Sequence, residues 1–193
     1  SVGPVPRVEV PTRRGEVRWR AGADCVEVDP VRGKAIQKVY NFGRYTHEDA
    51  YCTPDGKTVY LTDDHYPAVF FKFECEQPND YSKGQLYAYK QSTDGNSGEW
   101  IALPMNMKSL VNARDVAISK GATMFIRLEW IKEYNGKLYI SETGNDSTDY
   151  TSFIAQGGTI PNYLEKTYKY AEGKYHDPFG RILEFDLKTN RIR

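Results

Sequence analysis

The sequence predicts an all-β fold made of β-propeller blades, and three observations support this prediction. The chain is rich in aromatic residues, with 15 Tyr, 8 Phe and 3 Trp, which favour strands. It also holds 16 Gly and 10 Pro, which favour turns. Short segments of alternating apolar and polar residues recur between these turns, as in several four-stranded antiparallel blades. A β-sandwich and an irregular barrel share such short strands and are the alternatives.

Two similar hairpins are expected near the ends of the chain. Residues 25–29 alternate between apolar and polar side chains and return at residues 35–40 after a turn. Residues 181–185 alternate in the same way, and a second return begins at Arg191. Each pattern indicates an antiparallel pair of strands.

An internal repetition is more informative. Glu48 precedes an Asp-Gly pair at residues 55–56, and Glu129 precedes an Asn-Gly pair at residues 135–136. Such pairs favour a type I′ hairpin turn. Each turn leads into a strand that ends in a hydroxyl and then a carboxylate side chain, at residues 59–63 and 138–142. The repetition favours propeller blades.

The rest of the chain completes this outline. Residues 1–20 are expected to form an extended N-terminal arm with an edge strand at residues 16–20, and residues 21–193 a propeller segment. A short helix is expected within residues 163–174, inside an insertion at residues 148–175. At roughly 40 to 45 residues a blade, the chain supplies about four blades at most, so we expect a segment of a longer propeller. Further strands are expected at residues 68–74, 85–90 and 99–103.

Composition excludes several classes of function. The chain has 26 basic and 26 acidic side chains and no net charge, which argues against a general binder of nucleic acid or anionic membranes. No run of about 18 apolar residues predicts a membrane span. Cys25, Cys52 and Cys75 form no C-x-x-C pair, so neither a zinc site nor a thioredoxin-like motif is expected. Buried thiols, or one disulfide with a free thiol, are the alternatives.

Four residues are candidates for a functional site. Glu48 follows His47 in a polar segment, and its carboxylate is a natural calcium ligand. Arg127 and Glu129 stand two residues apart, so on a strand they would share one face. A guanidinium there suits a phosphate, because its planar fork binds two phosphate oxygens. Asp64 ends the strand after Glu48 and is a further candidate ligand. The alternatives are a solvated turn at Glu48, a surface salt bridge at Arg127 and ordinary turns at the strand ends.

These segments resemble the PhoX family of bacterial metal-dependent alkaline phosphatases, in the central portion of that family. The similar segments occur in the family's order, at residues 43–50 (GRYTHEDA), 60–64 (YLTDD), 70–73 (FFKF), 84–88 (GQLYA), 127–131 (RLEWI) and 177–184 (DPFGRILE). The resemblance implies a β-propeller that hydrolyses phosphate esters at a funnel holding calcium and iron. It places Glu48 and Glu129 as metal ligands, with Asp64 a candidate ligand at the same funnel, and Arg127 as the phosphate-contacting arginine. It also implies export to the periplasm or beyond.

The sequence departs from the family in two ways. The family's upstream segment with an iron-ligating cysteine is absent, and so are its C-terminal blades. Two hypotheses follow. The first is a metal-dependent phosphatase acting on small phosphate esters, whose remaining parts belong to a longer chain or a partner subunit. The second is a non-catalytic propeller that calcium stabilises and that binds a protein or glycan.

Overall fold

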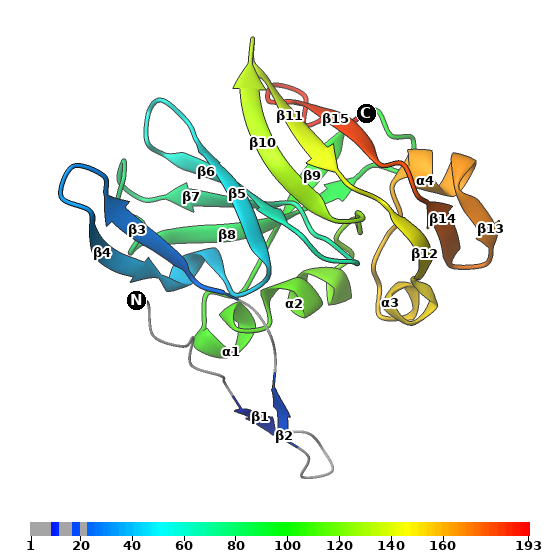
Figure 1. Cartoon of the computed structure of the whole chain (residues 1–193), viewed down its shortest axis with the longest axis horizontal. Coiled ribbons are helices and arrows are strands. Elements are labelled where there is room, and N and C mark those ends of the chain that lie inside the picture. The colour runs from blue at the N-terminus through cyan, green and yellow to red at the C-terminus, as the bar shows by residue number, and fades with distance from the viewer. Residues whose placement is uncertain (1–8, 12–16, 20–22) are drawn as a thin grey trace.

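The computed structural model describes residues 9–11, 17–19 and 23–193, and these residues are mostly β (Figure 1). The strands are β1 (Glu9–Pro11), β2 (Val17–Trp19), β3 (Cys25–Asp29), β4 (Lys34–Val39), β5 (His47–Cys52), β6 (Thr58–Asp63), β7 (Phe71–Cys75), β8 (Gly84–Gln91), β9 (Gly98–Ala102), β10 (Leu128–Tyr134), β11 (Lys137–Glu142), β12 (Asn145–Asp149), β13 (Lys169–Ala171), β14 (Lys174–Asp177) and β15 (Arg181–Asp186). The helices are α1 (Met107–Leu110), α2 (Ala113–Ser119), α3 (Thr151–Ala155) and α4 (Asn162–Thr167), with a 3₁₀ turn at Tyr40–Phe42.

The largest sheet is an antiparallel meander of five strands in the order β5-β6-β7-β8-β9. Its side chains alternate between two apolar clusters, as the period of a strand requires. On β6, Val59 and Leu61 enter one cluster, while Tyr60 between them enters the other. The sheet is therefore buried on both faces.

A second sheet, in the order β10-β11-β15, covers one face of the meander. Their shared core is aromatic, with Tyr60, Phe70, Tyr89 and Phe185 at ring-centroid distances of 5.3 to 6.2 Å. The Tyr89 hydroxyl donates to the carbonyl of Asn190 at 2.8 Å and ties the C-terminal turn to the meander. This packing brings β10 beside β5, the two strands that carry the candidate glutamates.

Helices and a small third sheet cover the other face. Ala113, Ala117 and Ile118 of α2 belong to the same buried cluster as Leu86 and Phe71 of the meander. The segment between β11 and β15 contains the third sheet, in the order β12-β14-β13, together with α3 and α4. Figure 1 shows this segment at one side of the molecule, beyond the end of α2.

Most of the expected strands are confirmed. Both terminal hairpins form: β3 pairs with β4, and β15 is followed by a return in which Ile192 bridges Phe185. In the arm, β2 lies within the expected edge strand and pairs with β1, while the rest of the first twenty residues lies outside the described residues.

Three expectations about the fold need correction. The main sheet has five strands where blades of four were expected, because β9 adds to the meander through residues 98–102. Helices α1, α2 and α3 were not expected, since helices of four to seven residues are too short to show a 3.6-residue period. The expected helix within residues 163–174 ends at Thr167, and β13 follows it.

The two Gly-containing turns also differ. Asn135 and Gly136 both have positive φ, 52° and 76°, as a type I′ turn requires. At the first turn, residues 55–56, only Gly56 has a positive φ, which is 69°. The amide of Gly56 donates to the carbonyl of Thr53 at 2.9 Å. The side chain of Asp55 accepts from the Thr53 hydroxyl and the Lys57 amide, which holds Asp55 out of the left-handed region.

No helix within the described residues is both long and apolar enough to cross a membrane.

Candidate functional site

The backbone at Arg127 is unusual. Its φ is +58°, in the left-handed region that a non-glycine residue seldom adopts. The sequence had suggested that Arg127 lies on the strand. It stands instead just before β10, which begins at Leu128. Residues 124–126, which precede it, are fully buried, as expected. A left-handed conformation typically costs about 1 to 3 kcal/mol and persists where its surroundings impose it.

The guanidinium of Arg127 lies between two of the predicted site residues. Its Nε donates to Asp64 Oδ1 at 2.9 Å, and its Nη2 donates to Asp64 Oδ2 at 3.4 Å and to Glu129 Oε1 at 3.2 Å. These carboxylates raise the pKa of Arg127, and the hydrogen bond that Arg127 donates to Asp64 contributes most. The Arg127 side chain stays 38% exposed, so its charge also faces solvent.

Glu129 is held from several directions. Its Oε1 also accepts from the hydroxyl of Thr143, which follows β11. Its backbone carbonyl accepts from the hydroxyl of Thr62 at 2.5 Å. Glu129 is half-buried and its carboxylate is fixed by two donors, so its position depends on both β6 and the end of β11.

Glu48 differs from Glu129. It lies exposed on β5, and its side chain makes no hydrogen bond or ion pair to another described residue. It is near enough to contribute electrostatically to the raised pKa of Arg127. Asp49 links the two strands, because its Oδ2 accepts from the Ile131 amide at 3.1 Å. The structure thus brings Asp64, Arg127 and Glu129 together and leaves Glu48 at their edge.

A buried ion pair lies beneath this site. Asp63 is fully buried and receives Nε and Nη2 of Arg114 at 2.7 and 2.5 Å. It also accepts from the amides of Thr46 and Val69 at 3.3 and 3.2 Å. Burial raises the pKa of Asp63, and the Arg114 guanidinium opposes that rise. Asp63 therefore anchors the loop that carries Asp64.

A second buried carboxylate lies at the equivalent place after Glu129. Glu142 ends β11, is 2% exposed and accepts from the Ile126 amide at 2.9 Å. The Tyr163 hydroxyl is 2.9 Å from each of its oxygens, and Arg181 Nε is 3.0 Å from Oε2. Burial raises the pKa of Glu142 to about 7. Carboxylates were expected at both strand ends, but an anchoring role was not, since their partners come from distant segments.

His47 lies next to Glu48 and is inward-facing. Its ring packs against that of Tyr45, with centroids 3.8 Å apart and planes tilted by 34°, and its Nε2 is 2.9 Å from the carbonyl of Gly43. Burial lowers the pKa of His47 to about 4, so the ring is neutral at neutral pH. Nε2 then carries the proton, because a carbonyl can only accept. His47 therefore positions the strand that carries Glu48.

The described side chains do not gather into a metal centre. Among the described residues, no three His, Cys, Asp or Glu side chains lie close enough together to hold an ion. Arg127 already engages the carboxylates of Asp64 and Glu129. These residues thus do not form a complete metal site by themselves. Cys25, Cys52 and Cys75 are unpaired, which removes the alternative of a disulfide.

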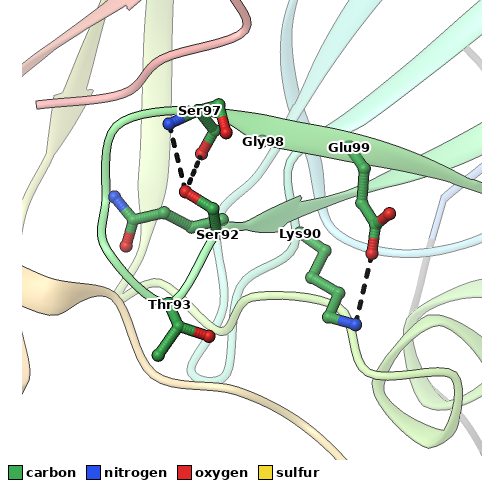
Figure 2. Close-up of a pocket in the computed structure, with 7 residues that line it drawn as sticks. Lys90, Ser92, Thr93, Ser97, Gly98 and Glu99 are labelled. Atoms are coloured by element: carbon green, nitrogen blue, oxygen red, sulfur yellow. Dashed lines mark hydrogen bonds and ion pairs between the residues drawn. The ribbon is translucent and has the colours of Figure 1, made fainter.

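A pocket at the turn between β8 and β9 is separate from these residues (Figure 2). Its charged groups pair with each other, since Lys90 Nζ is 3.2 Å from Glu99 Oε1. Ser92 accepts from the Ser97 amide at 3.1 Å and closes the turn. None of Glu48, Asp64, Arg127 and Glu129 lines this pocket, so the candidate site lies elsewhere, at Arg127.

Comparison with known proteins identifies the family of this chain. Residues 24–193 match the family described as alkaline phosphatase PhoX. The chain belongs to the PhoX family. Its fold is similar to a solved structure of Pseudomonas fluorescens PhoX in complex with vanadate, a transition state analogue, with a TM-score of 0.61 and 24% identity. The match covers 82% of this chain and 31% of that one. Curated protein sequences gave no match.

Proposed function

We propose that this chain supplies the phosphate-binding part of a metal-dependent phosphatase that hydrolyses phosphate monoesters. The observation that carries the proposal is the guanidinium of Arg127, held between Asp64 and Glu129 while 38% exposed. Membership of the PhoX family supports the same function.

The geometry leaves Arg127 able to bind an oxyanion. The contacts to Asp64 and Glu129 use Nε and Nη2, and Nη1 makes no hydrogen bond to another described residue. Its two N–H groups are therefore available to phosphate oxygens. Because the two carboxylates fix the guanidinium in advance, it would stabilise charge that develops on a transferring phosphoryl group without reorganising.

The metals are part of the proposal. Glu48 and Glu129 would each offer a carboxylate, with Asp64 beside them, to a calcium ion whose other ligands lie outside the described residues. Iron is proposed on the family resemblance alone. A bound metal would polarise the phosphoryl group and activate the attacking water. In this chain, Arg127 binds the phosphate, Asp64 orients Arg127, and Thr143 orients the Glu129 carboxylate.

Two further features are proposed with the activity. The sheets of this chain would form blades of a propeller, consistent with the similar fold of the Pseudomonas fluorescens protein. Periplasmic or extracellular location follows from the family resemblance.

The second candidate function is a non-catalytic, calcium-stabilised propeller that binds a protein or glycan. One observation favours it: Arg127 is ion-paired with both Asp64 and Glu129, as a structural salt bridge would be. The two functions differ in what Arg127 contributes.

Replacing Arg127 tests this difference in the intact protein. We expect Arg127→Ala to lower kcat/KM on a generic phosphate monoester by about 10² to 10³, the usual effect of losing one preorganised donor. Arg127→Lys should recover little, because a point charge lacks the planar fork. Arg44→Ala is the matched control, since Arg44 makes a bidentate pair with Asp24 and no hydrogen bond or ion pair to Asp64, Arg127 or Glu129.

The control should lose thermal stability and keep its kinetics. Wild-type kinetics in Arg127→Ala would exclude the catalytic proposal. A wild-type protein that is inactive with calcium and iron would support the binding module.

A further inference from the structure

We infer that Glu142 is a positioning residue for Arg127, and that Tyr163 holds Glu142 in place. The inference rests on the proposed role of Arg127 in phosphate binding and adds to it residues that touch neither phosphate nor metal.

The inference starts from the backbone of Ile126 and Arg127, where all four polar groups are paired. The Arg127 amide donates to the carbonyl of His65 at 2.8 Å, and the Arg127 carbonyl accepts from the amide of Thr143 at 3.0 Å. The Ile126 carbonyl accepts from the amide of Gly144 at 3.4 Å. The fourth group, the Ile126 amide, donates to Glu142 Oε1 at 2.9 Å.

Glu142 is thus the side chain among these partners, the other three being backbone groups. Ile126 is fully buried, so without Glu142 its N–H would be left unsatisfied away from water. The neighbouring φ of +58° at Arg127 is one that surrounding contacts must impose. Loss of the Glu142 contact therefore releases the segment that sets the direction of the guanidinium.

Glu142 also reaches the site through the next residue. Thr143 donates through its hydroxyl to Glu129 Oε1 and through its amide to the Arg127 carbonyl. A shift at the end of β11 would move both contacts together. Glu142 is therefore placed to set the relative positions of Arg127 and Glu129.

The carboxylate of Glu142 is itself fixed by residues from the segment between β11 and β15. The Tyr163 hydroxyl lies 2.9 Å from both of its oxygens, and Tyr163 is at the start of α4. Arg181 pairs with Glu142 and with Asp177, and its guanidinium lies 4.4 and 4.6 Å from the ring centres of Tyr163 and Tyr168. Cation–π contacts of this kind favour one orientation of the guanidinium.

The experiment compares two hydroxyl deletions with one carboxylate substitution in the intact protein. Tyr163→Phe removes the donor to Glu142 and keeps the ring against Arg181. Tyr89→Phe is the control, because Tyr89 is a fully buried tyrosine whose hydroxyl donates to the Asn190 carbonyl and not to α4. Glu142→Gln replaces the carboxylate by an amide of the same shape.

Two readouts are recorded. The first is kcat/KM on a phosphate monoester, with competitive inhibition by vanadate. The second is the Nε–H resonance of Arg127 in ¹⁵N-labelled protein, assigned from its loss in Arg127→Lys. This resonance reports the guanidinium directly and needs no activity, and thermal unfolding identifies variants that do not fold.

Glu142→Gln is expected to lower kcat/KM by up to about 10²-fold, the scale of a small misplacement of a binding group. Tyr163→Phe should lower it by a smaller factor, and both should shift the Arg127 resonance. Tyr89→Phe should change neither readout. Should Glu142→Gln not fold, Tyr163→Phe decides alone.

An unchanged Arg127 resonance in folded Tyr163→Phe and Glu142→Gln would overturn the inference. A wild-type protein that neither hydrolyses the ester nor binds vanadate would overturn the proposed function instead. In that case, a shifted resonance would still support the positioning of Arg127 by Glu142.

Discussion

The hairpins β5–β6 and β10–β11 are built in the same way and differ in how the buried carboxylate at the end of each is compensated. Each first strand carries a candidate glutamate, Glu48 or Glu129, and each second strand ends in a buried carboxylate. In both, that carboxylate binds a backbone amide upstream of the glutamate and a distant arginine. The residue after the carboxylate reaches the site, as Asp64 to Arg127 and Thr143 to Glu129.

The hydroxyl residues repeat as well. The Thr62 hydroxyl accepts from the amide of Asp49, and that of Ser141 accepts from the amide of Trp130. In each hairpin this amide belongs to the residue after the glutamate. The repetition read from the sequence is therefore a repetition of contacts.

The difference lies in how each carboxylate is compensated. Asp63 has a bidentate guanidinium of its own, whereas Glu142 shares Arg181 with Asp177 and relies on a tyrosine hydroxyl. Asp63 thus forms a full ion pair. Burial raises the pKa of Glu142 to about 7, so only about half of this carboxyl group is ionised at neutral pH. One hairpin is held by charge and the other mainly by hydrogen bonds.

The largest expected effect is on the free energy of unfolding when either buried carboxylate is replaced by its amide. Asp63→Asn should cost about 3 to 5 kcal/mol in the free energy of unfolding, because it leaves the charge of Arg114 buried without a partner. Glu142→Gln should cost clearly less, since Arg181 keeps its ion pair with Asp177. Chemical denaturation at neutral pH measures both. Equal costs would contradict the contrast between the two hairpins.

The pH dependence of stability sharpens the same contrast. The pKa of Glu142 is raised from an ordinary 4.5 to about 7, so its contribution to stability is lost as pH rises through this range. The pKa of His47 is lowered from 6.5 to about 4, so its contribution is lost as pH falls. Each contribution to the free energy of unfolding amounts to roughly 3 kcal/mol over the pH range between the two pKa values of its group. The contributions of Glu142 and His47 oppose each other between about pH 5 and 6.5.

The wild type is therefore expected to be nearly flat in unfolding free energy between about pH 5 and 6.5. Glu142→Gln should become more stable as pH rises, because the His47 contribution is then unopposed. His47→Asn should become less stable as pH rises. Denaturant titrations at several pH values measure these slopes, and slopes of the same sign in both variants would contradict the assignment.

The smallest expected effect concerns calcium and its proposed ligand Glu48. In the intact protein, removing calcium with a chelator should lower the melting temperature, because ligand binding to the native state stabilises it. Glu48→Gln should remove most of this response. It should change the chelated protein by no more than about 0.5 kcal/mol, since Glu48 is exposed. A melting temperature unaffected by chelator would contradict a calcium ion at this place.

The sequence predicted local features well and long-range contacts poorly. The alternation at residues 59–63 and the Asn-Gly pair at 135–136 specify a strand and a turn within a few residues, and both form. The left-handed backbone of Arg127 leaves no such local signal. It is imposed by Glu142, His65 and Thr143, which come from separate segments.

The candidate site shows the same limit. Arg127 and Glu129 were predicted as neighbours on a strand, and they are neighbours, although Arg127 stands just before the strand with a positive φ. Asp64 was predicted as a metal ligand, which stays a prediction, and its hydrogen bond to Arg127 was not foreseen. Short helices such as α2 went unpredicted because packing against the meander, more than their own sequence, stabilises them.

The pairing of Glu142 with Arg181 across β11 and β15 has a consequence for how this protein can vary. The segment between them contains β12 to β14 with α3 and α4. It leaves the sheet after Glu142 and returns to it at Arg181, which is paired with Glu142. Segments of this kind tolerate changes in length, because the strands that flank them keep their register. Tyr163 sets a limit to that freedom, since its hydroxyl returns to Glu142. Insertions on either side of α4 can lengthen the detour, whereas any change that moves α4 itself is transmitted to Ile126 and Arg127.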